Sequence, residues 1–111
     1  MNLKKKDIVL LPYPFTDLKG MKVRPAIVIS NDDFNSKSLD CIMVPLTSVI
    51  KDELYSILIT QEDLTFGKLI KPSRIRVDKV FTVEKRLVKM KIGTINQKIY
   101  ERIKSEFYKL L

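Results

Sequence analysis

Apolar residues fall into short runs that are separated by turn-forming residues along most of the chain. The runs are rich in Ile, Val and Leu, and Pro, Gly, Asn or Asp stands between them, which is typical of strands joined by turns. They lie at residues 7–12, 22–30, 40–47, 55–59, 68–78 and 88–92. We therefore expect roughly six short strands. Residues 34–38 fit either a single helical turn or a loop.

One of these runs is apolar at every position from Pro25 to Ile29 and ends in β-branched residues. A continuous run of this kind predicts a strand that is buried on both faces. Pro25 disfavours the helical conformation for the residue before it, so Arg24 is expected to be extended at the mouth of the strand. Taken alone, an Arg at a strand end is more often solvated or loosely paired than functional.

Two other runs contain a proline that is expected to bend the strand or end its pairing. Pro45 lies near the end of the run 40–47, so Thr47 and Ser48 should stand where that strand finishes. Taken alone, such hydroxyls more often satisfy backbone groups of the following loop. After Pro72 the alternation is regular. It puts Ile75 and Val77 on one face and Arg74, Arg76 and Asp78 on the other.

The period of the apolar residues changes near the C-terminus. They recur every three or four positions, at Ile99, Ile103, Phe107 and Leu110. This spacing predicts an amphipathic helix. Thr94 as the N-cap and Gln97 three residues later fit a capping box. Opposite charges three residues apart should pair on the exposed face, at Glu101 with Lys104 and Glu106 with Lys109. Residues 79–87 have a mixed pattern and give no prediction.

These elements predict a mainly β fold with one C-terminal helix, an α+β class in which a small β-barrel carries a helical lid. The 111 residues suffice for a single domain, here residues 1–111. No apolar run approaches the roughly 18 residues of a membrane span. The basic residues 1–6 are not followed by an apolar segment, so we expect no signal peptide. A single cysteine, Cys41, rules out an intramolecular disulfide and fits the cytoplasm.

The charge balance favours a polyanionic partner. Lys and Arg total 21 against 13 Asp and Glu, which gives a formal net charge of +8. A basic small domain of this kind suits nucleic acid or an acidic protein segment. The sequence contains no His. This absence removes the usual acid–base group and the commonest metal ligand, so we expect neither a metal site nor a His-dependent triad.

Several segments, in this order, resemble the MazF/PemK (Kid) family of type II toxin–antitoxin toxins. They are Asp7–Asp17, Arg24–Ser30, Val44–Ser48, Lys71–Asp78 and the pair Ile92–Gly93. The resemblance covers nearly the whole chain. It implies a compact SH3-like, antiparallel barrel similar to that of the gyrase poison CcdB, assembled as a homodimer. It also implies cleavage of single-stranded RNA without a metal or cofactor, and an antitoxin whose acidic tail blocks the groove.

The resemblance also implies roles for individual residues. Arg24 and Thr47 match the catalytic Arg and Thr of the family, and Asp78 matches an Asp used in the Kid branch. The residues implied in substrate binding are Tyr13, Phe15, Thr16, Lys19, Lys22, Ser48, Arg74 and Arg76. Some members place a His in or near the loop at residues 13–21, and this chain has none.

Attack of an RNA 2′-hydroxyl on the neighbouring phosphate is chemistry that such residues can support. It would leave a 2′,3′-cyclic phosphate and a 5′-hydroxyl. Arg24 would stabilise the developing charge and could also donate to the leaving 5′-oxygen, and Thr47 would donate to a non-bridging oxygen. Asp78 is the only carboxylate in these motifs that could accept the 2′-hydroxyl proton.

Three alternatives stay open at this point. Without the resemblance, Arg76 and Asp78 would more simply be an ion pair on one strand face. A gyrase-poisoning toxin on the same barrel is a second alternative. The lack of any Trp counts against it, because CcdB relies on a C-terminal Trp-Gly-Ile sequence. A non-catalytic module that only grips RNA phosphates is the third.

Overall fold

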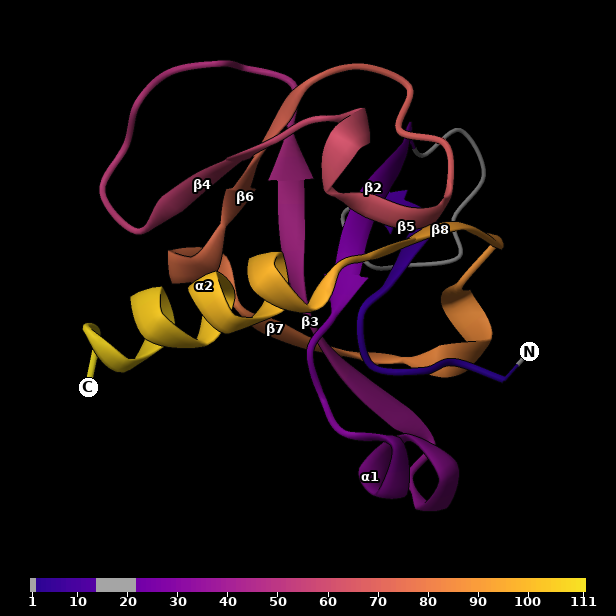
Figure 1. Ribbon diagram of the computed structural model, residues 1–111. Helices are drawn as coiled ribbons and strands as arrows, with labels where there is room; N and C mark the ends of the chain where they lie inside the picture. The colour runs from indigo at the N-terminus through magenta and orange to yellow at the C-terminus, as the bar shows by residue number, and fades with distance from the viewer. Residues whose placement is uncertain (1, 14–21) are drawn as a thin grey trace.

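The computed structural model describes residues 2–13 and 22–111, and it consists mainly of strands (Figure 1). The strands are β1 (Asp7–Tyr13), β2 (Lys22–Val28), β3 (Asp40–Thr47), β4 (Ser56–Ile59), β5 (Leu64–Gly67), β6 (Ser73–Arg76), β7 (Phe81–Glu84) and β8 (Met90–Ile95). The helices are α1 (Asp32–Lys37) and α2 (Gln97–Tyr108), and the 3-10 turns are η1 (Gln61–Asp63), η2 (Val77–Lys79) and η3 (Lys85–Leu87).

The strands form one antiparallel sheet that curls into a half-barrel. Its order is β4-β6-β3-β2-β1-β8-β5, and β7 pairs with β3 beside this path. One edge of β3 is therefore shared. β7 pairs with its first half, at residues 40–43, and β6 pairs with its end, at residues 46–47. The prediction of a mainly β fold with a C-terminal helix is confirmed.

The sheet is buried on both faces because its central strands alternate between two apolar clusters. Ile8, Ile27 and Val44 belong to the cluster that includes Ile99 and Ile103 of α2. Their neighbours face a second cluster, whose members include Leu3, Val9, Ala26, Val28, Met43 and Val83. Residues 26–28 of β2 are thus buried on both faces of the strand, as predicted, and the strand ends at Val28, before Ile29.

The cap of α2 differs from the prediction. The N-cap is Asn96, whose side chain accepts a hydrogen bond from the Ile99 amide at 2.8 Å, and Thr94 still belongs to β8. The strand continues past Thr94 because Thr94 pairs with Asp7 of β1. The capping box with Gln97 was therefore wrong. The predicted ion pairs of α2 are confirmed, at 2.8 Å for Glu101 with Lys104 and 3.1 Å for Glu106 with Lys109.

Other segments also depart from the sequence pattern. The strand predicted at residues 88–92 is β8, which covers Met90–Ile95, and β5 was not predicted. The strand expected over residues 68–78 covers only Ser73–Arg76. Before it, the side chain of Gln61 takes backbone hydrogen bonds that a neighbouring strand would otherwise make. Gln61 accepts a hydrogen bond from the Leu69 amide at 2.8 Å and donates one to the Gly67 carbonyl at 3.1 Å. Residues 79–87, for which no element was predicted, contain β7 between η2 and η3. Within the described part of the chain, no helix is long and apolar enough to cross a membrane.

Candidate active site

The end of β3 brings together residues from three strands. Ala26 of β2 and Pro45 of β3 form the last pair between these two antiparallel strands. Arg24 and Thr47 each lie two residues beyond that pair, so both come to the same end of the paired strands. On the other side of β3, Thr47 pairs with Arg74 of β6. The sheet thus places a hydroxyl between two strands that carry arginines.

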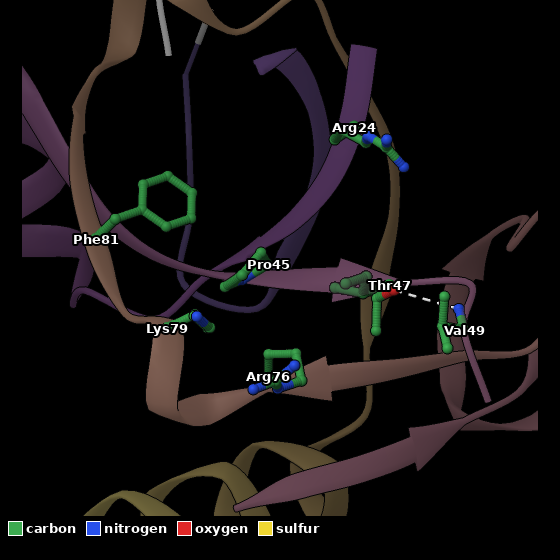
Figure 2. Close-up of a pocket in the computed structure, with 8 residues that line it drawn as sticks. Arg24, Pro45, Thr47, Val49, Arg76, Lys79 and Phe81 are labelled. Atoms are coloured by element: carbon green, nitrogen blue, oxygen red, sulfur yellow. Dashed lines mark hydrogen bonds between the residues drawn. The ribbon is translucent and has the colours of Figure 1, made fainter. Parts of the chain in front are cut away.

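A cavity of about 480 Å³ opens beside this point (Figure 2). Its lining residues are Arg24, Pro45, Leu46, Thr47, Val49, Arg76, Lys79 and Phe81. Three of these described side chains are cations and none of them is a carboxylate, so the cavity is suited to an anion such as a phosphodiester.

Arg24 combines a fixed backbone with an available guanidinium. Its backbone lies in the β1–β2 ladder, where Arg24 pairs with Leu11 and Pro25 pairs with Leu10. The side chain is exposed, and within residues 2–13 and 22–111 it makes no hydrogen bond or ion pair. A guanidinium of this kind can present two parallel N–H groups to phosphate oxygens without first breaking an internal contact.

Thr47 is half-buried and holds its hydroxyl in a defined place. Its Oγ1 accepts a hydrogen bond from the Val49 amide at 3.2 Å, which Figure 2 shows beside the cavity. Because the oxygen serves as acceptor, the O–H group stays available to donate. Ser48 is exposed and lines a neighbouring cavity of about 270 Å³, which shares Arg24 and Leu46 with the first.

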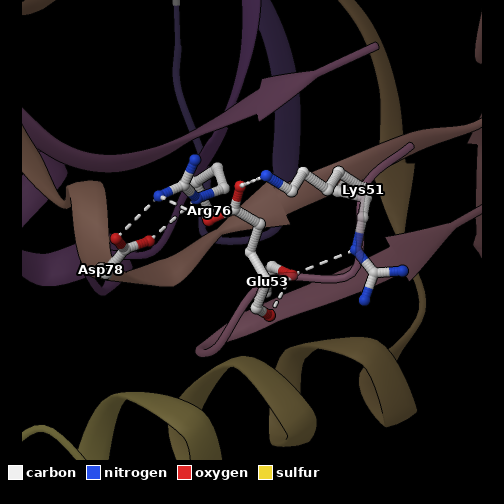
Figure 3. A network of polar contacts seen from close by, with 6 residues as sticks. Lys51, Glu53, Arg76 and Asp78 are labelled. Atoms are coloured by element: carbon white, nitrogen blue, oxygen red, sulfur yellow. Dashed lines mark hydrogen bonds and ion pairs between the residues drawn. The ribbon is translucent and has the colours of Figure 1, made fainter. Parts of the chain in front are cut away.

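Arg76 and Asp78 form a bidentate pair (Figure 3). Arg76 Nε donates to Asp78 Oδ1 at 3.0 Å, and Nη2 donates to Oδ2 at 2.9 Å. The hydrogen bonds from Arg76 lower the pKa of Asp78 below its ordinary value, and the same bonds raise the pKa of Arg76. Asp78 is therefore anionic at neutral pH. It does not line the cavity that Arg76 lines.

The loop after Thr47 brings carboxylates to both arginines of β6. Asp52 Oδ1 lies 3.0 Å from Arg74 Nη2, and Glu53 Oε2 lies 4.0 Å from Arg76 Nη2. Arg74 Nε also donates to Ser56 Oγ at 3.0 Å. Figure 3 shows Glu53 between Arg76 and Lys51. Arg74 is thus held towards β4 and lines neither of the two cavities.

The structure brings together part of the predicted site. Arg24, Thr47 and Arg76 share one cavity, and Ser48 lines the next. Asp78 and Arg74 lie beside it in ion pairs, and Lys22 is exposed at the start of β2 without lining either cavity. The predictions at Phe15, Thr16 and Lys19 fall outside the described residues, as does the side chain of Tyr13.

Sequence reasoning missed five of the described lining residues, which are Pro45, Leu46, Val49, Lys79 and Phe81. Lys79 and Phe81 follow β6 in the segment whose mixed pattern gave no prediction. The only local signal was their position directly after the Arg76–Asp78 motif.

Among the described residues, no group of three His, Cys, Asp or Glu side chains is placed to hold a metal ion.

Comparison with known proteins agrees with this architecture. Residues 4–111 match the family model described as PemK-like, MazF-like toxin of type II toxin-antitoxin system. No curated protein sequence matches the chain significantly.

Solved structures share the fold at low sequence identity. A MazE–MazF structure from Deinococcus radiodurans is 16% identical with a TM-score of 0.81, covering 99% of this chain and 96% of that one. An endoribonuclease in complex with its cognate antitoxin, from a mycobacterial species, is 15% identical with a TM-score of 0.77, covering 96% and 92%. The Mycobacterium tuberculosis toxin MazF-mt6 is 14% identical with a TM-score of 0.75, covering 93% of each chain. Since the family model spans all but the first three residues, the chain belongs to the PemK/MazF family of type II toxin–antitoxin toxins.

Proposed function

We propose that the chain is an endoribonuclease that cuts single-stranded RNA through attack of a 2′-hydroxyl on the adjacent phosphate. The observation that carries this proposal is the juxtaposition of Arg24 and Thr47 on a cavity whose described lining residues include three cations and no carboxylate. Fold relatives described as endoribonucleases, from mycobacterial species, give it further support.

Arg24 and Thr47 act on the charge that develops at phosphorus. In the transition state the non-bridging oxygens gain negative charge, which preorganised donors stabilise more strongly than they stabilise the ground state. Arg24 supplies a fork of N–H donors, and Thr47 supplies one O–H from a fixed oxygen. Arg76 adds a third donor from the opposite side of β3.

Asp78 was the candidate acceptor for the 2′-hydroxyl proton. Both of its oxygens are engaged by Arg76, and the resulting fall in its pKa weakens it as a base. We therefore assign Asp78 to positioning the Arg76 guanidinium, and the 2′-hydroxyl proton passes to water. Ser48, Lys22 and Arg74 contact flanking nucleotides, as do Tyr13, Phe15, Thr16 and Lys19 of the preceding loop.

A cognate antitoxin and a second copy of the chain complete the proposed assembly. One mycobacterial relative is described as an endoribonuclease in complex with its cognate antitoxin, and one from Deinococcus radiodurans is described as MazE–MazF. A net charge of +8 suits an acidic antitoxin segment, which would compete with RNA phosphates for the same cations.

The test is incubation of end-labelled single-stranded RNA with the purified chain in EDTA. We expect fragments ending in a 2′,3′-cyclic phosphate and a 5′-hydroxyl. The same oligonucleotide with a 2′-deoxy sugar at the cut should stay intact. Equal cutting of both would overturn the mechanism. Salt-sensitive RNA binding without any product would identify a non-catalytic binding module, and gyrase-dependent DNA breaks in expressing cells would identify a gyrase poison.

A further inference from the structure

A lysine outside the predicted site, Lys79, lines the cavity together with Arg24 and Thr47 (Figure 2). We propose that Lys79 is a further catalytic residue, the general acid that protonates the departing 5′-oxygen of the RNA. This inference rests on the proposed endoribonuclease function and names the group that completes its chemistry.

The backbone that carries Lys79 is firmly held. Lys79 ends the turn η2, whose first residue, Val77, is fully buried in the core cluster beneath α2. The Val77 amide donates to the Tyr55 carbonyl at 3.0 Å, which ties η2 to the start of β4. On the other side of Lys79, β7 begins at Phe81, which pairs with Met43 of β3. The backbone of Lys79 is therefore fixed, and its long side chain lies at the rim of the cavity.

The ammonium of Lys79 is also uncommitted. Within the described ranges, 2–13 and 22–111, it makes no hydrogen bond or ion pair, and the residue is exposed. The neighbouring carboxylate of Asp78 is already bound on both oxygens by Arg76. Arg76 is thus partly neutralised, whereas Lys79 and Arg24 form no ion pair with the described residues; the charge of Lys79 acts on Asp78 only as the last and smallest cause of its lowered pKa.

The two uncommitted cations differ in the chemistry that they can perform. A guanidinium holds its protons too tightly to be a useful acid near neutral pH, so Arg24 is suited to charge stabilisation. A lysine ammonium has three N–H groups and gives up a proton more readily than a guanidinium. Of the described lining residues that carry a charge, Lys79 is therefore the best proton donor.

In the proposed step, the bond from the 2′-oxygen to phosphorus forms while the bond from phosphorus to the 5′-oxygen breaks. The proton of the 2′-hydroxyl passes to water, and Lys79 Nζ transfers a proton to the 5′-oxygen. The products are the 2′,3′-cyclic phosphate and the 5′-hydroxyl, and Lys79 takes a proton back from solvent.

The test compares two RNA substrates that differ only in the leaving atom. One has the ordinary 5′-oxygen, and the other has sulfur at that bridging position. A thiolate leaves without protonation, so a general acid matters only for the oxygen substrate. Single-turnover rates are measured for the unsubstituted chain, Lys79→Ala, Arg24→Ala and Lys98→Ala, an exposed lysine of α2 that serves as the control.

We expect Lys79→Ala to cut the oxygen substrate about 100-fold more slowly or worse, and to cut the sulfur substrate within a few-fold of the unsubstituted chain. Arg24→Ala should cut both substrates slowly, and Lys98→Ala should cut both at the rate of the unsubstituted chain. A Lys79→Ala deficit of equal size on both substrates would overturn the proposal, as would no deficit on the oxygen substrate. Cleavage of ordinary RNA by the unsubstituted chain reports separately on the proposed function.

Discussion

Arg76 Nε and Nη2 donate two parallel hydrogen bonds to the carboxylate of Asp78, at 3.0 and 2.9 Å. The two residues are two positions apart in the chain, at the end of β6 and in η2, and both side chains are about one-quarter exposed. This pair fixes the guanidinium that faces the cavity. It also holds the Asp78 carboxylate away from the cavity, which Asp78 does not line.

The replacement Asp78→Asn tests the ion pair that positions Arg76, through the pH dependence of the free energy of unfolding. The pKa of Asp78 is lowered in the folded chain, so its stabilising contribution is present above the unfolded pKa of about 3.9 and is lost as pH falls through the folded value. We expect Asp78→Asn to lower the free energy of unfolding by about 0.5–1 kcal/mol at pH 7, because the pair is partly exposed. In urea unfolding the difference should shrink below about pH 4. A difference that is the same at pH 7 and pH 3 would contradict this account.

Replacement of Thr47 separates its hydroxyl from its shape. Thr47→Val removes the O–H donor and should slow RNA cleavage about 10²- to 10³-fold, the usual cost of one transition-state donor. Thr47→Ser keeps the oxygen that accepts from the Val49 amide and should recover most of the rate. Single-turnover cleavage measures both. A serine variant as slow as the valine variant would show that the methyl group, and hence packing, matters more than the hydroxyl.

Asp52 is expected to compete with RNA for Arg74. Its side chain is 94% exposed, whereas that of Arg74 is only 13% exposed, so the carboxylate is the partner that can leave. We expect Asp52→Asn to tighten RNA binding roughly two- to fivefold at low salt, and to steepen the dependence of affinity on salt by about one phosphate contact. Fluorescence anisotropy with a non-cleavable 2′-deoxy oligonucleotide measures both quantities.

Asp33→Asn is the matched control for that experiment. Asp33 is an exposed acid of α1 that pairs with Lys37 at 2.9 Å, and its replacement changes the net charge by the same amount. If both variants tighten binding equally, net charge alone explains the effect and the competition at Arg74 is refuted.

The fold was predictable where one residue pattern dominated. The apolar run after Arg24 predicted a strand with two buried faces, and the spacing of Ile99 and Ile103 predicted α2, because periodicity reports burial directly. The helix start was not predictable, since pairing between Thr94 and Asp7 extends β8 beyond the point that local capping preference indicates. The strand β7 was missed because the charged residues of η2 and η3 interrupt the apolar pattern on both sides of it.

The candidate site was predictable only in part, because contacts between distant parts of the chain bring some of its residues to the cavity. Arg24 and Thr47 were found through the resemblance of their strands to a family, and the register of β2 and β3 brings them to one cavity. Lys79 reaches that cavity because η2 carries the chain from β6 to β7, which follow one another along β3 and both run antiparallel to it. That turn depends on the burial of Val77 and its bond to Tyr55, which no local pattern reveals.

The central claim is that Arg24 is the main charge stabiliser for RNA cleavage, and single-turnover cleavage by Arg24→Ala tests it most directly. Arg24 is exposed and makes no described contact, so the variant should fold with unchanged stability, and Arg102→Ala, which removes an exposed arginine of α2, controls for charge. The account predicts a rate about 10²- to 10³-fold lower for Arg24→Ala and an unchanged rate for Arg102→Ala. Cleavage by folded Arg24→Ala at the rate of the unsubstituted chain would contradict the account.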